Sequence, residues 1–522
     1  MKKIKQLLLI VILFLSLFTL SSCGKNTDLK IIDINLTDEE YAFVVEKNNY
    51  SLKEKMDNYL KEIKASGELD EIIDKYSNDK KGKVGVTPKT EGYVNDEKTF
   101  VVATNMPFGP FEYVDSDGKA YGIDIEIAIG FAEKHNLDLV VVHMDFDSII
   151  LDVNSKKSDI GMAGFTITPS REEICLFTDP YYNASQKLIV KSDNETFNNC
   201  KTKEDVENIL KSLENTKIGY QNGTTGNWYI KGDESFGFEG YENIEGVGNS
   251  KLLALAQELG NGAIFAIVVD ELPAEQLVKK YNALNSNFID KAKIENFIEY
   301  ISEGYYQQLI LTGLRNTMLI AIFGLAIGLV IGIVIGIIKV APKYKFSMKA
   351  LDKLSTVYVT IFRGTPIIVQ LLVGYYIIIP MFSITVDKLI VAIIIFGLNS
   401  GAYVAEIIRG GISSVDKGQL EAARALGLTY NTSMIKIVIP QAIKNIIPTI
   451  GNEFITLVKE TSIVSFISVM DLYNAFNNIG SASYEVMVPY LVMALIYIAL
   501  IVLISVGVKF IERMLAKSDK SK

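Results

Sequence analysis

The sequence predicts an α/β domain followed by an all-α membrane domain. Within residues 98–282, strand-like and helix-like patterns alternate, which is typical of α/β folds. Residues 291–522 instead hold long apolar runs, each with roughly the 20 residues needed to cross a bilayer. A short stretch at the N-terminus, residues 1–23, precedes both parts. Composition therefore already divides this chain of 522 residues into separate domains.

The totals argue against several classes of function. A net charge of −9 is unfavourable for a nucleic-acid partner, because such proteins present basic surfaces. Three cysteines and two histidines leave little material for a metal site, and we expect neither a metal nor a cofactor. No GxxxxGK[ST] sequence and no nucleophile–base pattern is present, so we do not expect this chain to be an enzyme.

The first 23 residues have the form of a secretory signal. Lys2, Lys3 and Lys5 precede the apolar run LLLIVILFLSLFTL, and small residues follow it. The next residues, up to Cys23, read LSSC and resemble a lipobox, which would make Cys23 the lipidated first residue of the mature chain. The alternative is an uncleaved first span. In both cases the chain that follows lies outside the cytoplasm.

Five apolar runs in the C-terminal part predict five membrane spans. They lie at about 309–338, 355–380, 386–408, 441–466 and 488–510. Lysines and arginines gather in the first loop, in residues 409–440 and after the last span. The positive-inside rule therefore places residues 409–440 and the C-terminus in the cytoplasm. The first run also carries four glycines at four-residue spacing, which predict a helix-packing seam: Gly324, Gly328, Gly332 and Gly336.

The loop of residues 409–440 contains EAARALGLTYNTSMIKIVIP, starting at residue 421. Two small residues on a short helix allow close packing against another protein, and Gly427 allows a left-handed turn after that helix. The stretch resembles the EAA loop of ABC importer permeases, which docks into an ATPase subunit. The matching positions are Glu421, Ala422, Ala423 and Gly427. An ordinary amphipathic loop is the alternative.

A second stretch, FRGTPIIVQ at 362–370, closely resembles the signature of polar amino acid permeases. The two motifs together imply that residues 291–522 form an all-α, five-span transmembrane ABC permease domain. The resemblance also implies two partners. One is a separate cytoplasmic ABC ATPase, and the other is a second copy of the permease in a homodimer.

Residues 98–290 resemble the body of solute-binding proteins of the polar amino acid family. This resemblance implies a bilobed α/β domain of the periplasmic-binding-protein type, yet the segment that should end this fold is missing after Asp270. Residues 24–76 resemble that missing segment, although they stand in front of the domain. We therefore expect a circular permutation, with residues 77–97 as a polar linker. The alternative is a vestige of a duplicated domain.

Arg171 and Asp270 are the strongest candidates for ligand binding. Arg171 presents a fork of donors that suits a carboxylate, and Asp270 ends a strand-like run where it could receive an ammonium group. Either residue alone would be interpreted as a solvated surface charge. The resemblance to the solute-binding family implies that both contact the ligand. It adds Gly164 and Thr166 at the charged groups, Thr224 or Thr225 at the carboxylate, Phe108 and Phe111 as covering rings, and Asn105 and Gln221 near the side chain.

These features predict the binding and permease subunit of an ATP-driven amino acid importer in the cell membrane. Because Asn105 and Gln221 are neutral and polar, we expect a neutral polar amino acid such as glutamine, with cystine as the second candidate. A ligand-gated channel or a membrane sensor is the alternative, although no filter sequence such as TVGYG is present. The spacing of Cys175 and Cys200 leaves open whether they form a disulfide.

Overall fold

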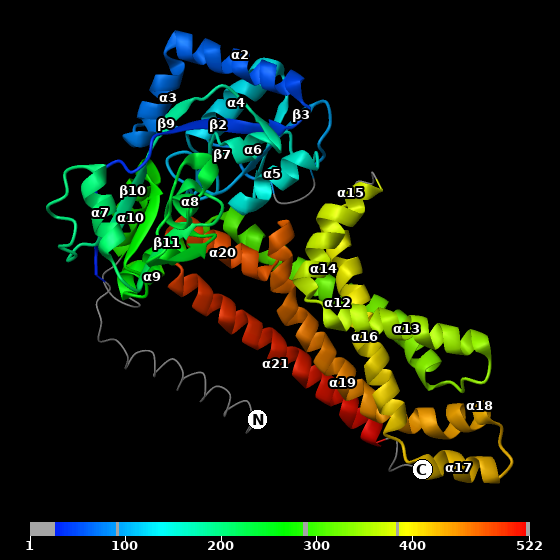
Figure 1. Ribbon diagram of the computed structural model, residues 1–522. Coiled ribbons are helices and arrows are strands. Elements are labelled where there is room, and N and C mark those ends of the chain that lie inside the picture. Colours follow the sequence, from blue (N-terminus) through cyan, green and yellow to red (C-terminus); the bar gives the residue numbers. More distant parts are fainter. Residues whose placement is uncertain (1–26, 90–92, 285–290, 383–385, 518–522) are drawn as a thin grey trace. The chain divides into compact units, whose positions relative to one another are not determined.

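The computed structural model of the protein describes residues 27–89, 93–284, 291–382 and 386–517. The described chain divides into two compact units. The N-terminal unit comprises the residues up to Tyr306 together with Asn478–Pro489, and the helical unit comprises Gln307–Asn477 and the residues from Tyr490 onward. The first unit is α/β and the second is all-α, as the sequence predicts (Figure 1).

The first lobe of the N-terminal unit is built on a six-stranded sheet. Its strands are β2 (Glu39–Glu46), β3 (Thr99–Thr104), β6 (Asp138–His143), β7 (Ile160–Thr166), β8 (Cys175–Phe177) and β9 (Tyr182–Ala184). The order is β6–β3–β7–β2–β8, and β9 also pairs with β2. β3 is parallel to β6 and β7, whereas β2 is antiparallel to its neighbours. Every residue of β7 is buried, as expected for a central strand.

Helices cover this sheet: α2 (Tyr50–Ser66), α3 (Glu68–Ser77), α4 (Ile123–His135), α5 (Phe146–Asn154) and the short α6 (Pro169–Glu172). A small hairpin, β4 (Tyr113–Val114) and β5 (Ala120–Tyr121), lies between β3 and α4 in the chain. The helical spacing of Met56, Leu60 and Ile63 predicts α2, and all three side chains are buried. Asn49 caps the start of α2, and Gly67 ends it with a φ of 83°.

The second lobe holds a five-stranded sheet of order β1–β10–β13–β11–β12. These strands are β1 (Leu29–Ile32), β10 (Gln186–Lys191), β11 (Thr216–Gln221), β12 (Ile244–Asn249) and β13 (Ala266–Asp270). The helices of this lobe are α7 (Lys203–Ser212), α8 (Thr225–Lys231), α9 (Leu252–Asn261) and α10 (Glu271–Leu284), with a 3-10 turn at Glu234–Phe236. Its own core gathers Leu188, Ile218 and Val268.

The N-terminal segment takes part in both sheets. β2 lies inside the first sheet, between β7 and β8, and β1 forms the edge of the second sheet beside β10. At the far end of the second lobe, the Asn282 side chain accepts from the Leu29 amide at 2.8 Å and donates to the Leu29 carbonyl at 2.9 Å. The start of β1 is thus held against the end of α10, where the chain leaves this lobe.

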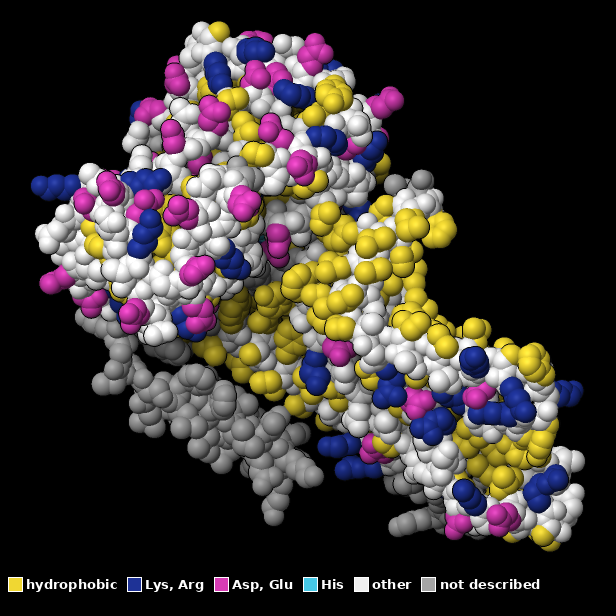
Figure 2. Space-filling model, viewed as in Figure 1, with side chains coloured by type: hydrophobic (Ala, Val, Ile, Leu, Met, Phe, Trp, Pro, Cys, Tyr) yellow, Lys and Arg dark blue, Asp and Glu magenta, His cyan; other side chains and the backbone are white. Residues whose placement is uncertain are grey.

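The helical unit contains a bundle of long and short helices (Figure 1). They are α12 (Gly304–Val340), α13 (Phe346–Gly364), α14 (Ile367–Val373), α15 (Ile379–Met381), α16 (Lys388–Ser413), α17 (Lys417–Ala425), α18 (Tyr430–Ser433), α19 (Ile439–Glu460), α20 (Leu472–Ser483) and α21 (Met487–Lys517). α12, α20 and α21 start or end in the N-terminal unit, which also contains α11 (Lys291–Ser302). Figure 2 shows apolar side chains over much of the bundle, with Lys and Arg gathered near α13 and α17.

Among the described residues, three helices are long and apolar enough to cross a membrane: α12, α16 and α21. A fourth span results if α13 and the α14–α15 segment count as one, with a bend of 103° between them. The predicted span at 441–466 corresponds to α19, which is not among these. Lys444, Glu453, Lys459 and Glu460 make α19 more polar than the others. The count of five spans therefore stays a prediction.

The glycine seam predicted in the first apolar run is present. A Cβ atom at Gly324, Gly328, Gly332 or Gly336 would lie 3.2, 2.8, 2.5 or 2.7 Å from atoms of four residues of α16. Those residues follow the same four-residue spacing: Phe396, Ser400, Val404 and Ile408. Small residues let α12 and α16 approach this closely, which is how helices associate in membranes.

Candidate functional site

A small cavity lies where the two lobes of the N-terminal unit meet. It is lined from the first lobe by Phe108, Phe146, Gly164, Thr166 and Arg171, and from the second lobe by Gln221, Thr224, Thr225 and Asp270. Its volume is about 10 Å³, the room of about one water molecule. Eight of these nine residues are among the predicted ligand contacts, and Phe146 is the addition.

Arg171 is held at the start of α6 with its guanidinium inside the cavity wall. Thr168 caps α6 by accepting from the Arg171 amide, and a proline follows the cap. The guanidinium donates to the Thr166 carbonyl of the first lobe and the Gly223 carbonyl of the second, both at 2.8 Å. It also lies over the rings of Phe146, Phe165 and Trp228. Burial lowers the pKa of Arg171 to about 10, so it stays charged at neutral pH.

Asp270 forms the opposite wall, at the end of β13. Its Oδ1 atom accepts from Gln186 Nε2, in the side chain, at 2.7 Å and from the hydroxyl of Tyr41. Burial, and next the nearby charge of Glu39, raise the pKa of Asp270 to about 7. The side chain can thus exist as a carboxylate or a carboxylic acid near neutral pH.

Glu39 is a second buried carboxylate that sequence reasoning missed. It accepts from Gln186 Nε2 at 3.1 Å and from Thr166 Oγ1 at 2.6 Å, and Thr225 Oγ1 donates to Thr166 across the lobes at 3.1 Å. Glu39 and Tyr41 both belong to β2, in the displaced segment. Treating that segment as the strand next to β7 would have been the signal, because it places the start of β2 opposite Thr166.

Only glycine fits at position 164, because of the backbone conformation there and the side chains that lie close to it. Its φ is +58°, and a Cβ atom would lie 2.8 Å from the Phe108 ring and 2.9 Å from the Tyr41 ring. Its amide points at Asp124 Oδ2, 3.3 Å away, and Asp124 also accepts from the Tyr181 hydroxyl at 2.6 Å. Burial raises the pKa of Asp124 to about 7.

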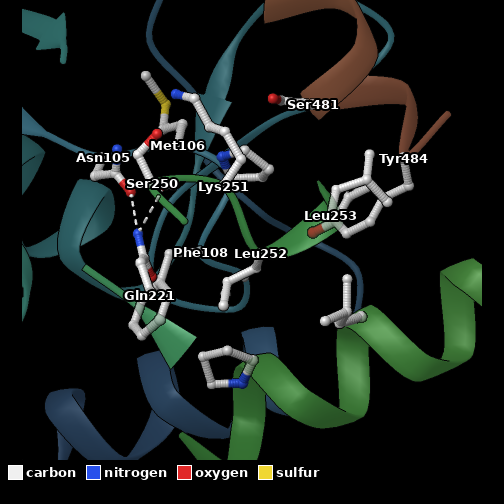
Figure 3. A pocket seen from close by; sticks show the side chains of 14 residues that line it. Asn105, Met106, Phe108, Gln221, Ser250, Lys251, Leu252, Leu253, Ser481 and Tyr484 are labelled. Carbon is white, nitrogen blue, oxygen red and sulfur yellow. Dashed lines mark hydrogen bonds between the residues drawn. The ribbon is translucent and has the colours of Figure 1, made fainter. Parts of the chain in front are cut away.

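A second cavity of about 20 Å³ adjoins the first and shares Phe108 and Gln221 with it (Figure 3). Here Gln221 Nε2 donates to Asn105 Oδ1 at 3.0 Å, and Asn105 Nδ2 donates to the Met144 carbonyl at 2.7 Å. Asn105 therefore lies beside the first cavity rather than on its wall. Phe111 lines neither cavity. Its ring is buried behind them, 5.3 Å from the Tyr41 ring.

Of the three cysteines, Cys175 and Cys200 are among the described residues. Cys23 lies outside the described residues. Cys175 and Cys200 are both free, and the Cys175 thiol donates to the Arg171 carbonyl at 3.1 Å. Among the residues with assigned positions, no group of His, Cys, Asp or Glu could hold a metal ion.

The EAA-like motif forms α17 in the helical unit. Glu421 and Ala422 are exposed, whereas Ala423 is buried and packs inside the unit. Gly427 has a φ of +85°, which confirms the expected left-handed turn. Leu426, beside it, is 83% exposed. Glu421, Ala422 and Leu426 thus form a short polar and apolar surface that is exposed in the described structure.

Glu406 joins three helices of the helical unit. It forms ion pairs with Arg409 of α16 at 2.8 Å, Lys339 of α12 at 3.7 Å and Arg363 of α13 at 3.9 Å. Arg363 is the arginine of the FRGTP stretch. The FRGTP stretch is therefore linked by an ion pair to the place where α12 and α16 pack together.

Two protein families match the chain. Residues 328–517 match the family described as binding-protein-dependent transport system inner membrane component. Residues 100–359 match the family of bacterial extracellular solute-binding proteins, family 3. The two matches overlap at residues 328–359, from within α12 into α13, and together they include residues of both units.

Individual relatives agree. The arginine transport system permease protein ArtQ of Bacillus subtilis is 41% identical over 162 residues, which is 31% of this chain and 74% of ArtQ. A putative glutamine transport system permease protein, GlnP of Rickettsia typhi, is 44% identical over 156 residues, which is 30% of this chain and 72% of GlnP. A solved amino acid ABC transporter with histidines is 37% identical, covering 42% of this chain and 98% of its own, with a TM-score of 0.38.

The solute-binding family match covers the part of the lobes that contains Arg171 and Asp270, and the inner membrane component match covers α13 to α21. The chain belongs to the permeases of binding-protein-dependent ABC importers of the polar amino acid family, and it carries its solute-binding protein in the same polypeptide.

Proposed function

We propose that the chain captures a neutral polar amino acid outside the cell and passes it through its own membrane helices. Glutamine is the first candidate and cystine the second. One observation carries this proposal: Arg171 and Asp270 face the same cavity from different lobes, which is the arrangement that a zwitterion needs. The guanidinium suits the α-carboxylate, and the Asp270 carboxylate suits the α-ammonium.

Binding requires the lobes to move apart and close again. A cavity of about 10 Å³ admits no amino acid, and several hydrogen bonds near it cross from lobe to lobe. They include those that join Arg171 to Gly223, Thr225 to Thr166, and Gln221 to Asn105. Separation of the lobes would free these donors for the ligand, and closure around the ligand would then be a hinge motion.

The side-chain end of the site supports a neutral ligand. Asn105 and Gln221 can offer an amide donor or acceptor but no charge. Lys251, which lines the adjoining cavity, is paired with Asp145 at 2.7 Å, so its charge is already balanced. A charged ligand side chain would be left without a partner in a closed cleft, which is costly.

Residues 24–76 are proposed to complete the binding fold as a circular permutation. The support is the position of β2 between β7 and β8 and the bonds between Leu29 and Asn282. A vestigial segment would have no reason to supply a central strand or the buried Glu39. The linker of residues 77–97 then joins α3 to β3, and residues 98–290 form the remainder.

We further propose that a separate ATPase docks at α17, through Glu421 and Ala422, and that two copies of the permease domain (residues 291–522) form the path. The exposed polar residues Asn445, Thr449 and Asn452 of α19 support such pairing, because polar side chains facing lipid are costly. In this arrangement five spans cross the membrane, the lobes lie outside, α17 and the C-terminus lie inside, and Cys23 adds a lipid anchor after signal cleavage. Family membership leaves no support for a ligand-gated channel or sensor.

The test is titration calorimetry of the full chain in detergent with the twenty amino acids and cystine. We expect binding of one neutral polar amino acid, abolished by Arg171→Ala. Lys217→Ala, at a surface ion pair with Glu245, serves as the control and should bind as the wild type does. Absence of binding to a folded chain would contradict the proposal. Binding of arginine instead of a neutral ligand would overturn the substrate class alone.

A further inference from the structure

The turn between α20 and α21 belongs to the N-terminal unit, although both helices continue into the helical unit. Residues Asn478–Pro489 pack with the lobes. Within this turn Tyr484 has a φ of +52°, which is uncommon for a residue with a bulky side chain. The Tyr484 amide donates to the Ser481 carbonyl at 3.3 Å, and the Glu485 amide donates to the Gly480 carbonyl at 3.1 Å. These bonds give the turn a defined structure, which directs the Tyr484 side chain toward the lobes.

The Tyr484 side chain is inserted beside the lobes. It is only 6% exposed and belongs to the same apolar core as Phe108 and Leu277. The Lys280 ammonium of α10 lies 4.1 Å from the centroid of its ring. Tyr484 and Ser481 line the 20 Å³ cavity, and in Figure 3 they approach it from the side opposite Asn105. A permease residue therefore closes one end of the interlobe cleft.

Two bonds from α11 fix the backbone of the turn. The Asn296 side chain donates to the Ser483 carbonyl at 3.0 Å, and the Tyr300 hydroxyl donates to the Ala482 carbonyl at 2.9 Å. Tyr300 is itself buried. Because α11 leads directly into α12, these bonds join the turn to the first long permease helix in the chain.

The site that receives Tyr484 is built from both lobes. The first lobe contributes the loop Asn105 to Gly109, and the second contributes Leu252 and Leu253 of α9 with Pro273 and Leu277 of α10. Two of the lining residues, Phe108 and Gln221, also line the ligand cavity. Separation of the lobes would pull these walls apart, so the complete site exists only when the cleft is closed.

We propose that Tyr484 is the element through which the permease senses closure of the binding lobes. This inference rests on the proposed function, since it assumes that an amino acid closes the cleft. A residue that contacts the closed lobes better than the open ones must favour closure. By reciprocity, a ligand that closes the lobes must strengthen the seating of Tyr484 to the same degree. Ligand occupancy is thereby communicated to α20 and α21 through one turn.

The first test compares ligand affinity in full chains. L-glutamine, L-cystine and L-arginine are titrated into wild type, Tyr484→Ala and Tyr473→Ala in detergent. Tyr473 lies on α20 within the helical unit and is the matched control. We expect Tyr484→Ala to bind about 5- to 150-fold more weakly, the usual range of coupling between sites. Tyr473→Ala should bind as the wild type does.

The second test measures hydrogen–deuterium exchange of residues 478–489 with and without the amino acid that binds. Reduced exchange on ligand addition is expected in the wild type and should be lost in Arg171→Ala. The inference would be overturned if Tyr484→Ala binds with unchanged affinity and if exchange of residues 478–489 in the wild type is the same with and without the ligand. Amino acid binding itself would remain established in that case. If none of the three amino acids binds the wild-type chain, the proposed function fails, and this inference fails with it.

Discussion

Ligand affinity should depend on pH through Asp270. Above a pKa of about 7, Asp270 is a carboxylate that can accept the ligand's ammonium, and below it the protonated group cannot. A free amino acid stays zwitterionic between pH 5 and pH 8, so the ligand itself adds no dependence there. Affinity should therefore rise with pH up to about neutrality and then level off.

The magnitude follows from the fraction of chains that hold an ionised Asp270. With a pKa of about 7, that fraction is about nine-tenths at pH 8 and about one-hundredth at pH 5, so apparent affinity should fall roughly 90-fold. The groups facing Asp270 are Glu39, Tyr41 and, across the cavity, Arg171. Arg171 remains charged over this range, and burial keeps Tyr41 neutral by raising its pKa.

Glu39→Gln should move the midpoint of this pH profile to lower pH. Glu39 is the second cause of the raised pKa of Asp270, after burial, and glutamine removes its charge with little change in shape. The assay is calorimetric titration of the full chain at half-unit steps between pH 5 and pH 8.

Asp124→Asn is the control, because Asp124 is another buried carboxyl group with a pKa of about 7 and lies behind Gly164. It should leave the midpoint in place. A flat profile in the wild type would refute the reasoning. So would a profile that disappears in Asp124→Asn and persists unchanged in Glu39→Gln.

Two further outcomes are expected. Deleting residues 28–77 removes β2 from the middle of the first sheet, so amino acid binding measured by calorimetry should be lost, and unchanged binding would show that the segment is vestigial. Ala422→Trp adds bulk to the exposed face of α17 without touching the buried Ala423, so it should abolish ligand-stimulated ATP hydrolysis in a complex reconstituted with its ATPase. Amino acid binding by the same variant should stay normal. Stimulated hydrolysis at the wild-type rate would show that α17 is not part of the docking surface.

The sequence predicts site residues that lie close together in one motif, but not those that meet only through pairing of distant strands. Arg171 and Thr166 lie in one short motif, and the structure brings them to the same cavity as Asp270. Glu39 reaches Thr166 and Gln186 only through sheet pairing, over separations of 127 and 147 residues. No local pattern marks such a residue. Its role emerges only once the displaced strand is paired with β7.

A local sequence pattern also does not show which way a side chain faces where its neighbours decide the orientation. Phe111 follows a proline-containing loop, like Phe108, yet its ring packs behind Tyr41 instead of facing the cavity. The apolar run at 441–466 predicts a span, but ionisable residues within α19 lower its hydropathy below that of α12, α16 and α21. Residues of that kind are tolerated in membranes where they face other protein or water, which periodicity alone does not reveal.

The permuted order changes how the two lobes are connected to the rest of the chain. Residues 39–184 form the first lobe as one continuous insertion, and the chain enters and leaves it through two neighbouring connections. These connections run side by side: the Leu36 amide donates to the Gln186 carbonyl at 2.9 Å, and Glu39 pairs with Ala184.

The start of β1 and the end of α10, joined by Asn282, both belong to the second lobe. The second lobe is therefore the one that leads along the chain to α11 and α12. The first lobe also contacts the start of α12, where the Tyr306 hydroxyl donates to the Asp115 carbonyl at 2.8 Å, so a swing about the paired connections must break this contact. Glu39 and Gln186 lie at this hinge and also bond to the wall of the ligand cavity. Ionisation or ligation of Asp270 therefore acts directly on the residues about which the lobes must turn.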